Sequence, residues 1–153
     1  MTTEADSKGE GLGGEGSGRI IPYLSTNSAG VSNEELAKVR KYITAQYGKE
    51  YLPESANVYK EKKAAQAAHE AIRPTSAMRH PDQIKQYLKE DEFKVYKLIW
   101  QRFIASQIAP AVFDQTTVDI DAKSGAEKFW FRVTGSVLKF DGFLKVYEEA
   151  KDV

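Results

Sequence analysis

The sequence predicts an α+β fold in which helices come first and an antiparallel hairpin follows. Apolar side chains recur with a helical period between residues 32 and 108, and after Pro110 the period changes to two. Hydrophobic residues make up 41% of the 153 and aromatic residues 11%, which is typical of a chain with a folded core. Because the helices precede the strands, the order indicates either one α+β domain or helices of one domain leading into strands of the next.

The N-terminal part is predicted to begin with a flexible leader and a short strand. Residues 1–18 are rich in glycine and carry a net charge of −3, a composition that is typical of flexible segments. Residues 20–24 could form a short buried strand. Pro22 would confine it to an edge or an end, because proline donates no ladder hydrogen bond.

Two helices are predicted before Pro74. Ser32 with Glu35 three residues later forms a capping-box pattern, and Gly48 stands where a helix that begins there would stop. The alanine-rich stretch at residues 60–72 favours a second helix over part of its length, ended by Pro74.

Two more helices are predicted before Pro110. A short helix begins at Pro81 and runs through Leu88. Asp91 can cap a long helix that reaches about Ile108, and its broad apolar face makes it the main element of the core.

The alternation after Pro110 predicts the hairpin. Val118 and Ile120 alternate with polar residues, residues 122–128 form the turn, and alternation resumes at residues 129–133, with an extension through residues 137–140. Asp119 and Asp121 have the spacing of a metal-binding pair. On a strand of period two, however, both carboxylates point to the solvent side.

Bulk composition excludes several classes of protein. Lys+Arg and Asp+Glu number 22 each, so net charge gives no argument for a nucleic-acid partner. With no cysteine there is no thiolate nucleophile, disulfide or cysteine-based zinc site. No apolar run approaches the roughly 18 residues of a membrane span, and the first residues lack the order of a signal peptide. We expect a soluble intracellular protein.

Tyr23, in the stretch RIIPYLSTNS, is the first candidate for chemistry. It is either an aromatic residue that closes a short buried strand or a nucleophile. A phenol has a pKa near 10, so as a nucleophile it needs cationic neighbours, and the nearest in sequence is Arg19.

Residues 56–80 form a basic segment that is the second candidate. Two tyrosines, Tyr51 and Tyr59, stand near it, and basic residues beside aromatic ones suit single-stranded nucleic acid. The alternative is a solvated face. His69 and Arg73 would share a helix face and could bind a phosphate, or His69 could be an ordinary exposed histidine. The segment has a net charge of +3 from Lys60, Lys62, Lys63, Arg73 and Arg79 against Glu61 and Glu70.

Several blocks, read together, resemble bacterial DNA topoisomerase I, a type IA enzyme. They are GEGSGRIIPYLSTNSAGVS, YLPESANVY, AAQAAHEAIRPT, YKLIWQRFIASQIAPAVFDQTTVDI and RVTGSVLKFDGFLKVYEE. The resemblance covers roughly residues 9–149 and implies that Tyr23 forms a transient 5′-phosphotyrosine link to DNA. It also implies that His69 lies close to the active site. DNA contacts are expected from Ser25, Thr26, Lys62, Lys63 and Arg73.

The sequence departs from the family pattern beside the tyrosine. Ser25 stands where the family has an arginine, Asn27 replaces an aspartate and Pro22 a threonine. Loss of a cation at the scissile phosphate removes an electrostatic contribution of roughly 3 kcal/mol or more. The family's TOPRIM domain, which binds Mg²⁺, has no counterpart in the sequence. We therefore expect no metal or cofactor in this chain.

The resemblance implies an organisation and a function. We expect a flexible leader at 1–18, part of the tyrosine-bearing helical domain at 19–90, and a long helix with antiparallel strands of the arch domain at 91–153. The chain would be a fragment of an enzyme that relaxes negatively supercoiled DNA, inactive alone. The alternative is a non-catalytic remnant that binds single-stranded DNA. Either would be monomeric, without membrane contact, in the bacterial cytoplasm near the nucleoid, with DNA, chiefly single-stranded, as partner.

Overall fold

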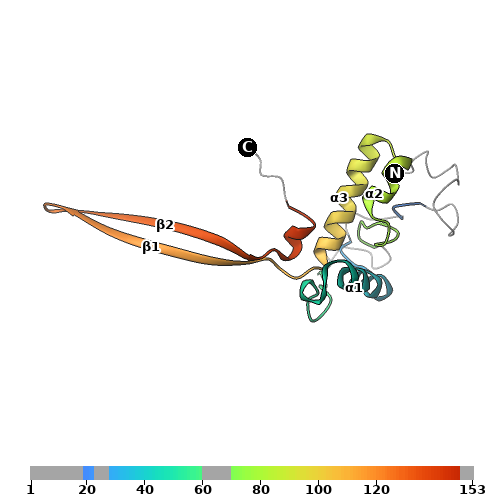
Figure 1. Cartoon of the computed structure of the whole chain (residues 1–153), viewed down its shortest axis with the longest axis horizontal. Helices are drawn as coiled ribbons and strands as arrows, with labels where there is room; N and C mark the ends of the chain where they lie inside the picture. The colour runs from blue at the N-terminus through green and yellow to red at the C-terminus, as the bar shows by residue number, and fades with distance from the viewer. Residues whose placement is uncertain (1–18, 23–27, 60–69, 149–153) are drawn as a thin grey trace.

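The computed structural model describes residues 19–22, 28–59 and 70–148, which form a helical body and a long projecting hairpin (Figure 1). We call residues 112–140 the hairpin arm and the other described residues the helical body. Among the described residues, no helix is both long and apolar enough to cross a membrane. The elements are α1 (Asn33–Tyr47), η2 (Lys49–Tyr51), α2 (Pro81–Ile84), η3 (Lys85–Tyr87), α3 (Glu90–Ser106), β1 (Val112–Ser124), β2 (Glu127–Phe140) and η4 (Gly142–Lys145).

Helix α1 confirms the predicted start, with one difference in its capping. The Ser32 hydroxyl accepts a hydrogen bond from the Glu35 N–H at 3.5 Å, as the pattern predicts. In a full capping box the Ser32 N–H would donate to the Glu35 side chain. Here it donates to Glu70 Oε1 instead, at 3.3 Å. The Glu35 carboxylate is engaged by Arg73 instead. The start of α1 is thus tied to a segment far away in the sequence.

The helices after Pro74 are confirmed, with corrected boundaries. The helix predicted from Pro81 forms as α2 and continues as the 3₁₀ turn η3. The long helix α3 begins at Glu90, so the prediction of Asp91 as its cap was wrong. Lys89 is the N-cap, and its N–H donates to the Glu92 carboxylate at 3.0 Å. Asp91 lies in the first turn, where a negative charge suits the helix dipole.

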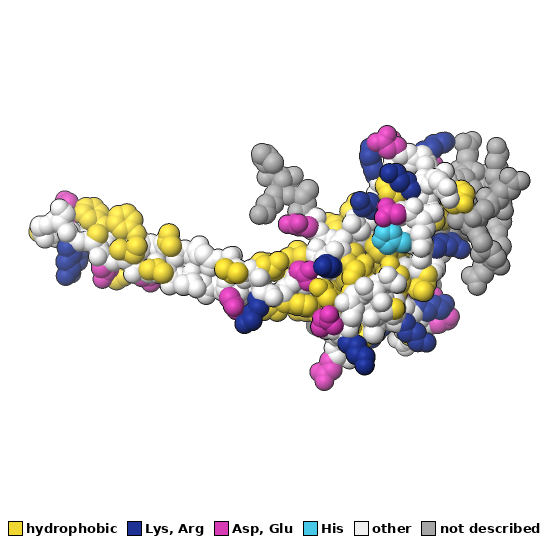
Figure 2. All heavy atoms as spheres, in the orientation of Figure 1, with side chains coloured by type: hydrophobic (Ala, Val, Ile, Leu, Met, Phe, Trp, Pro, Cys, Tyr) yellow, Lys and Arg dark blue, Asp and Glu magenta, His cyan; other side chains and the backbone are white. Residues whose placement is uncertain are grey.

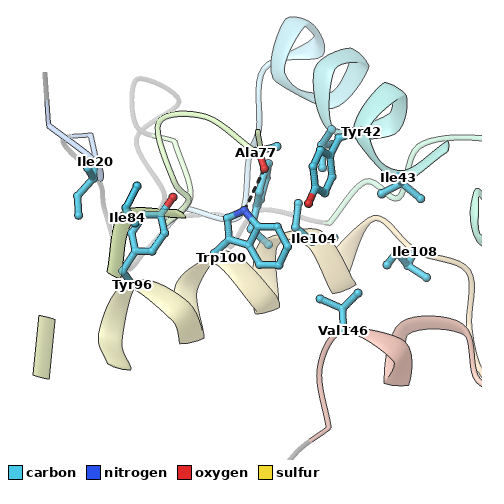
Figure 3. Packing of buried hydrophobic residues seen from close by; sticks show 12 residues of the cluster. Ile20, Tyr42, Ile43, Ala77, Ile84, Tyr96, Trp100, Ile104, Ile108 and Val146 are labelled. Carbon is cyan, nitrogen blue, oxygen red and sulfur yellow. Dashed lines mark hydrogen bonds between the residues drawn. The ribbon is translucent and has the colours of Figure 1, made fainter. Parts of the chain in front are cut away.

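The core of the helical body lies between α1 and α3 (Figure 3). Trp100 is 2% exposed, and its indole N–H donates to the Ala77 carbonyl at 3.0 Å. The Tyr96 hydroxyl likewise donates to the Arg79 carbonyl at 2.8 Å, so these two large side chains bury without leaving a polar atom unpaired. The buried set comprises Ile20, Val39, Tyr42, Ile43, Ala77, Ile84, Tyr96, Trp100, Phe103, Ile104, Ile108 and Val146.

The described part of the predicted strand at residues 20–24 is not a strand. Residues 20 and 21 form a bend and Pro22 has no regular structure, while residues 23 and 24 lie outside the described residues. The Ile20 side chain is buried as expected, but its carbonyl accepts hydrogen bonds from the backbone N–H and the hydroxyl of Thr75, at 2.9 and 3.1 Å. Its backbone partner is therefore a loop, which offers no ladder to extend. Of the helix predicted within residues 60–72, residues 70–72 are not helical and the rest lies outside the described part.

The hairpin arm confirms the predicted antiparallel pairing and is longer than predicted. Strands β1 and β2 pair from Val112 opposite Phe140 to Ser124 opposite Glu127. The turn contains Gly125, whose φ of 62° lies in the left-handed region that favours glycine. Almost every residue of both strands is exposed, on both faces. The arm therefore has no core of its own.

The arm joins the helical body through a few specific contacts. The Tyr51 hydroxyl donates to Asp141 Oδ1 at 2.7 Å, and this bond lowers the pKa of the Asp141 carboxyl. Gly142 has φ of 48°, and a Cβ there would lie 2.5 Å from the Ala109 carbonyl oxygen. The Phe143 N–H donates to that same carbonyl at 3.0 Å. The chain can leave and re-enter the body at this point only because residue 142 has no side chain.

Candidate functional site

The predicted site residues fall into two groups in the structure. Arg73 lies in the helical body and can be described in atomic detail. The others lie outside the described residues, so their roles stay predictions. They are Tyr23, Ser25, Thr26, Lys62, Lys63 and His69.

Arg73 is buried, with 8% of the residue exposed, and each nitrogen of its guanidinium donates to a protein oxygen. Its Nε and Nη2 both reach Glu70 Oε2, at 3.0 and 2.6 Å. Its Nη1 reaches Glu35 Oε2 at 3.3 Å and the Pro74 carbonyl at 3.0 Å. This arrangement fixes the segment at residues 70–74 against the first turn of α1.

Glu70 completes the link between this segment and α1. Burial raises the pKa of its carboxyl, but hydrogen bonds from Arg73 and from the Ser32 N–H outweigh that effect, and the net pKa is lowered. Glu70 is therefore ionised at neutral pH and accepts charge-assisted hydrogen bonds on both sides. A phosphate would have to compete with two carboxylates for Arg73, so its predicted role as a DNA contact stays a prediction.

Thr75 holds the residues just before Tyr23 next to the segment that contains Glu70 and Arg73. Its backbone N–H and its hydroxyl both donate to the Ile20 carbonyl, three residues before Tyr23. The Thr75 hydroxyl also accepts a hydrogen bond from Arg79 Nη1 at 3.2 Å. Two blocks that are 55 residues apart in sequence are thus joined, with a guanidinium beside the joint.

The sequence analysis missed the structural partners in this cluster. Glu35 was assigned to capping alone, and Arg79 was counted only as one charge of the basic segment. Sequence spacing gave one usable signal, since Glu70 stands only three residues before Arg73 and carries the opposite charge. Nothing local predicts the approach of Glu35, which is 38 residues from Arg73.

The acidic and histidine side chains of the described residues lie scattered and do not cluster. None of the described His, Cys, Asp and Glu side chains form a group of three or more that could hold a metal. Asp119 of the hairpin arm faces solvent and pairs with Arg132, whose Nε lies 2.6 Å from Asp119 Oδ1. That interaction lowers the pKa of Asp119.

Comparison with known proteins places this geometry in context. The family model described as DNA topoisomerase matches residues 16–153. The chain is 45% identical over 146 residues to DNA topoisomerase 1 of Xylella fastidiosa, in the strains Temecula1 / ATCC 700964 and 9a5c. Each match covers 95% of this chain and 18% of the relative.

A solved structure gives the same result for the fold. Full-length topoisomerase I from Thermotoga maritima matches with a TM-score of 0.69 and 34% sequence identity. That match covers 86% of this chain and 20% of the other. The chain therefore spans about a fifth of the length of the proteins it matches, and the α+β arrangement of helices followed by an antiparallel pair is confirmed.

Proposed function

The chain belongs to the bacterial DNA topoisomerase family, and from this premise we propose that it is the part of a type IA enzyme that carries the nucleophilic tyrosine, Tyr23. In this role the Tyr23 phenolate oxygen attacks a DNA phosphorus and forms a 5′-phosphotyrosine bond. The bond from phosphorus to the 3′ oxygen breaks, and that oxygen leaves as a hydroxyl after it takes up a proton. Attack by the same hydroxyl reverses the step and reseals the strand.

The joint between Ile20 and Thr75 is the observation that carries this proposal. It anchors the residues just before Tyr23 to the loop that follows Arg73, and so brings together two blocks on which the family resemblance rests. A reacting group and its supporting residues must be held within a few tenths of an ångström, and such hydrogen bonds supply that constraint. Arg79 adds a positive charge beside the joint.

Ser25 favours a second reading, in which the chain binds DNA without cutting it. The expected arginine would stabilise the charge that develops at the phosphate, and a serine hydroxyl supplies no positive charge. In this reading the fold and the basic segment remain, while cleavage is lost. The two readings differ in one observable, which is a covalent bond between Tyr23 and DNA.

DNA binding is common to both readings. We assign phosphate contacts to Lys62 and Lys63, with Thr26 and Ser25 near the scissile phosphate and His69 close to the reacting groups. Arg73 is expected to reach DNA only if the phosphate displaces part of its carboxylate contacts. We further propose a monomer that prefers single strands and acts at the bacterial nucleoid. Magnesium would bind in a TOPRIM domain of the full-length enzymes, and relaxation would require that domain.

Salt-dependent binding tests this proposal. A labelled oligonucleotide of about 12 nucleotides should bind with an affinity that falls as salt rises from about 50 to 200 mM. Replacing Lys62 and Lys63 with glutamine should reduce the slope of log affinity against log salt by roughly 1.4, since each lost phosphate contact contributes about 0.7 for single strands. The measurement is fluorescence anisotropy.

The matched control is the double variant Lys123→Gln, Lys128→Gln. These two lysines face each other across the exposed tip of the hairpin arm, so the charge change is the same but lies far from the described residues of the basic segment (Figure 1). The control should bind as the unchanged chain does. Affinity that does not depend on salt, or an equal loss in both double variants, would contradict the assignment. The unchanged chain in magnesium buffer should leave supercoiled plasmid unrelaxed.

A further inference from the structure

A groove on the helical body lies between residues 57–59 and the C-terminal end of α3. It has two parts that share lining residues, one of about 570 Å³ that extends to Phe143 and Tyr147, and one of about 470 Å³ that extends to Ala71 and Ile72. Both volumes fall in the range of roughly 300–1,000 Å³ of small-molecule sites. The residues that line both parts are Asn57, Val58, Tyr59, Arg102 and Ser106.

The charge of this groove favours an anionic ligand. Arg102 is the one charged residue among the described residues that line it, and none of those residues carries a carboxylate. The Arg102 guanidinium lies over the Tyr147 ring, 5.5 Å from the centroid, which holds it at the groove. The described lining therefore carries a net positive charge, whereas the chain as a whole has a formal net charge of zero.

Tyr59 provides a flat apolar wall in the same groove. Its hydroxyl donates to the Ser106 carbonyl at 2.8 Å, which fixes the ring, yet 49% of the residue is exposed. Burial raises the pKa of the Tyr59 phenol, so the hydroxyl stays a donor at neutral pH. A fixed and half-exposed aromatic ring suits the stacking of a base, because every base has a flat π face.

Gln107 adds an unpaired acceptor to the lining of the smaller part of the groove, which extends to Ala71. The residue is 1% exposed, and its Nε2 donates to the Asn57 carbonyl at 3.1 Å, which fixes the orientation of the amide. Its Oε1 has no hydrogen-bond partner in the described part of the chain. Buried acceptors are nearly always paired, so an unpaired buried oxygen on a residue that lines a groove favours a ligand that brings a donor.

We propose that this groove is a subsite for one unpaired nucleotide of single-stranded DNA. The base stacks on Tyr59, an N–H donor of the base reaches Gln107 Oε1, and the adjoining phosphate lies against Arg102. A nucleotide combines the flat ring, the donor and the negative charge that these three groups require. The subsite rests on the proposed DNA-binding function and adds to it a contact made through the base.

Three variants test the subsite on the full chain with a labelled oligonucleotide of about 12 nucleotides. Tyr59→Ala should weaken binding roughly tenfold, as expected for the loss of one stacked base. Tyr59→Phe keeps the ring and should bind within about threefold of the unchanged chain. Arg102→Gln should weaken binding and reduce the salt slope by roughly 0.7. Thermal melting establishes that each variant folds.

Gln107→Leu is compared on two probes, an oligonucleotide with all its bases and one with abasic sites. The variant should lose affinity for the first and not for the second, because only the first brings a base donor to the amide. Trp130→Ala and Lys97→Gln are the matched controls, since both side chains are exposed and lie outside the groove. Both should bind as the unchanged chain does.

The outcomes separate the subsite from the proposed function. If the unchanged chain binds with the expected salt dependence and the groove variants match the controls, the subsite is overturned while DNA binding stands. If the unchanged chain does not bind the oligonucleotide, both fail. A free deoxynucleoside monophosphate is also tested as a competitor of the labelled oligonucleotide. If it competes at the same concentration as the unlabelled oligonucleotide, the groove is a mononucleotide site, and the assignment to a DNA strand is overturned.

Discussion

The two tryptophans of this chain show how differently its two regions are built. Trp100 in the helical body is 2% exposed and hydrogen-bonded, whereas Trp130 in the hairpin arm is 72% exposed. The helical body is held by burial and by hydrogen bonds between distant segments. The hairpin arm is held by its ladder and by contacts at its base. A tryptophan therefore contributes strongly to the stability of the helical body and very little to that of the hairpin arm.

The apolar face of the hairpin arm makes the contrast sharper. Val118 faces Val133 and Ile120 faces Phe131, so these side chains share one face, and each is at least 46% exposed. Figure 2 shows hydrophobic side chains gathered toward the free end of the arm. An isolated two-stranded hairpin is marginal in water, so we expect the arm to lose its structure before the helical body does.

Removal of the buried tryptophan should give the largest effect. Trp100→Ala should lower the free energy of unfolding by about 3–5 kcal/mol, because it opens a cavity and leaves the Ala77 carbonyl without its donor. Trp130→Ala should change it by less than about 0.5 kcal/mol, as for an exposed site. Urea unfolding followed by circular dichroism measures both. An equal loss of unfolding free energy in the two variants would contradict the difference described between the helical body and the hairpin arm.

The junction between the regions should give an intermediate effect. Gly142→Ala places a Cβ against the Ala109 carbonyl at a residue with positive φ, at a cost of about 1–3 kcal/mol. Gly135→Ala is the matched control, since a Cβ at that position in the arm meets nothing within 4 Å. In thermal melting, Gly142→Ala should therefore unfold at a lower temperature than Gly135→Ala. If Gly142→Ala melts at the same temperature as Gly135→Ala, the junction is not constrained as described.

The Arg73 cluster should give a smaller effect that depends on pH. Arg73→Met should destabilise the chain at pH 7 by about 1–2 kcal/mol, less than for a fully buried pair because Glu70 is about a third exposed. The pKa of Glu70 is lowered on folding from its ordinary value of 4.5. Its contribution is therefore present above that value and is lost as the pH falls through the lower folded pKa.

The melting temperatures of the unchanged chain and Arg73→Met should therefore converge in acid. Arg132→Met is the control, because its partner Asp119 lies on the exposed hairpin arm and the helical body should melt as before. A difference between Arg73→Met and the unchanged chain that stays constant from neutral to acid pH would mean that the cluster contributes by packing and not by charge.

The sequence predicted the elements better than it predicted their environment. The helical period together with the cap at Ser32 located α1, and the helical period alone located α3, because these signals are local and amphipathic helices bury one face. The alternation of residues 118–133 predicted the hairpin correctly. It gave no sign that both faces would be exposed, since period two reports pairing geometry and not what covers the sheet. The strand expected at residues 20–24 failed at residues 20–22 because Ile20 bonds to a loop.

The candidate site was predictable only in part. The block around Arg73 was identified from its resemblance to the family, and its basic charge was visible in the sequence. Its actual neighbours, Glu35 and Ser32, come from a helix about 40 residues earlier, and no local pattern specifies such a contact. Gln107 was equally hidden, because its unpaired oxygen is a property of the folded groove.

Covalent capture of DNA tests the central claim most directly. The chain is mixed with a TOPRIM-containing fragment of a related topoisomerase, magnesium and a labelled single strand, and the denatured mixture is examined for labelled protein. Ser25→Arg is compared with the natural Ser25, and Tyr23→Phe serves as the control. We predict labelled protein with Ser25→Arg at a level at least tenfold above Ser25, and none with Tyr23→Phe in the arginine background. Labelled protein that persists with Tyr23→Phe, or none even with the arginine restored, would contradict the assignment of Tyr23 as the nucleophile.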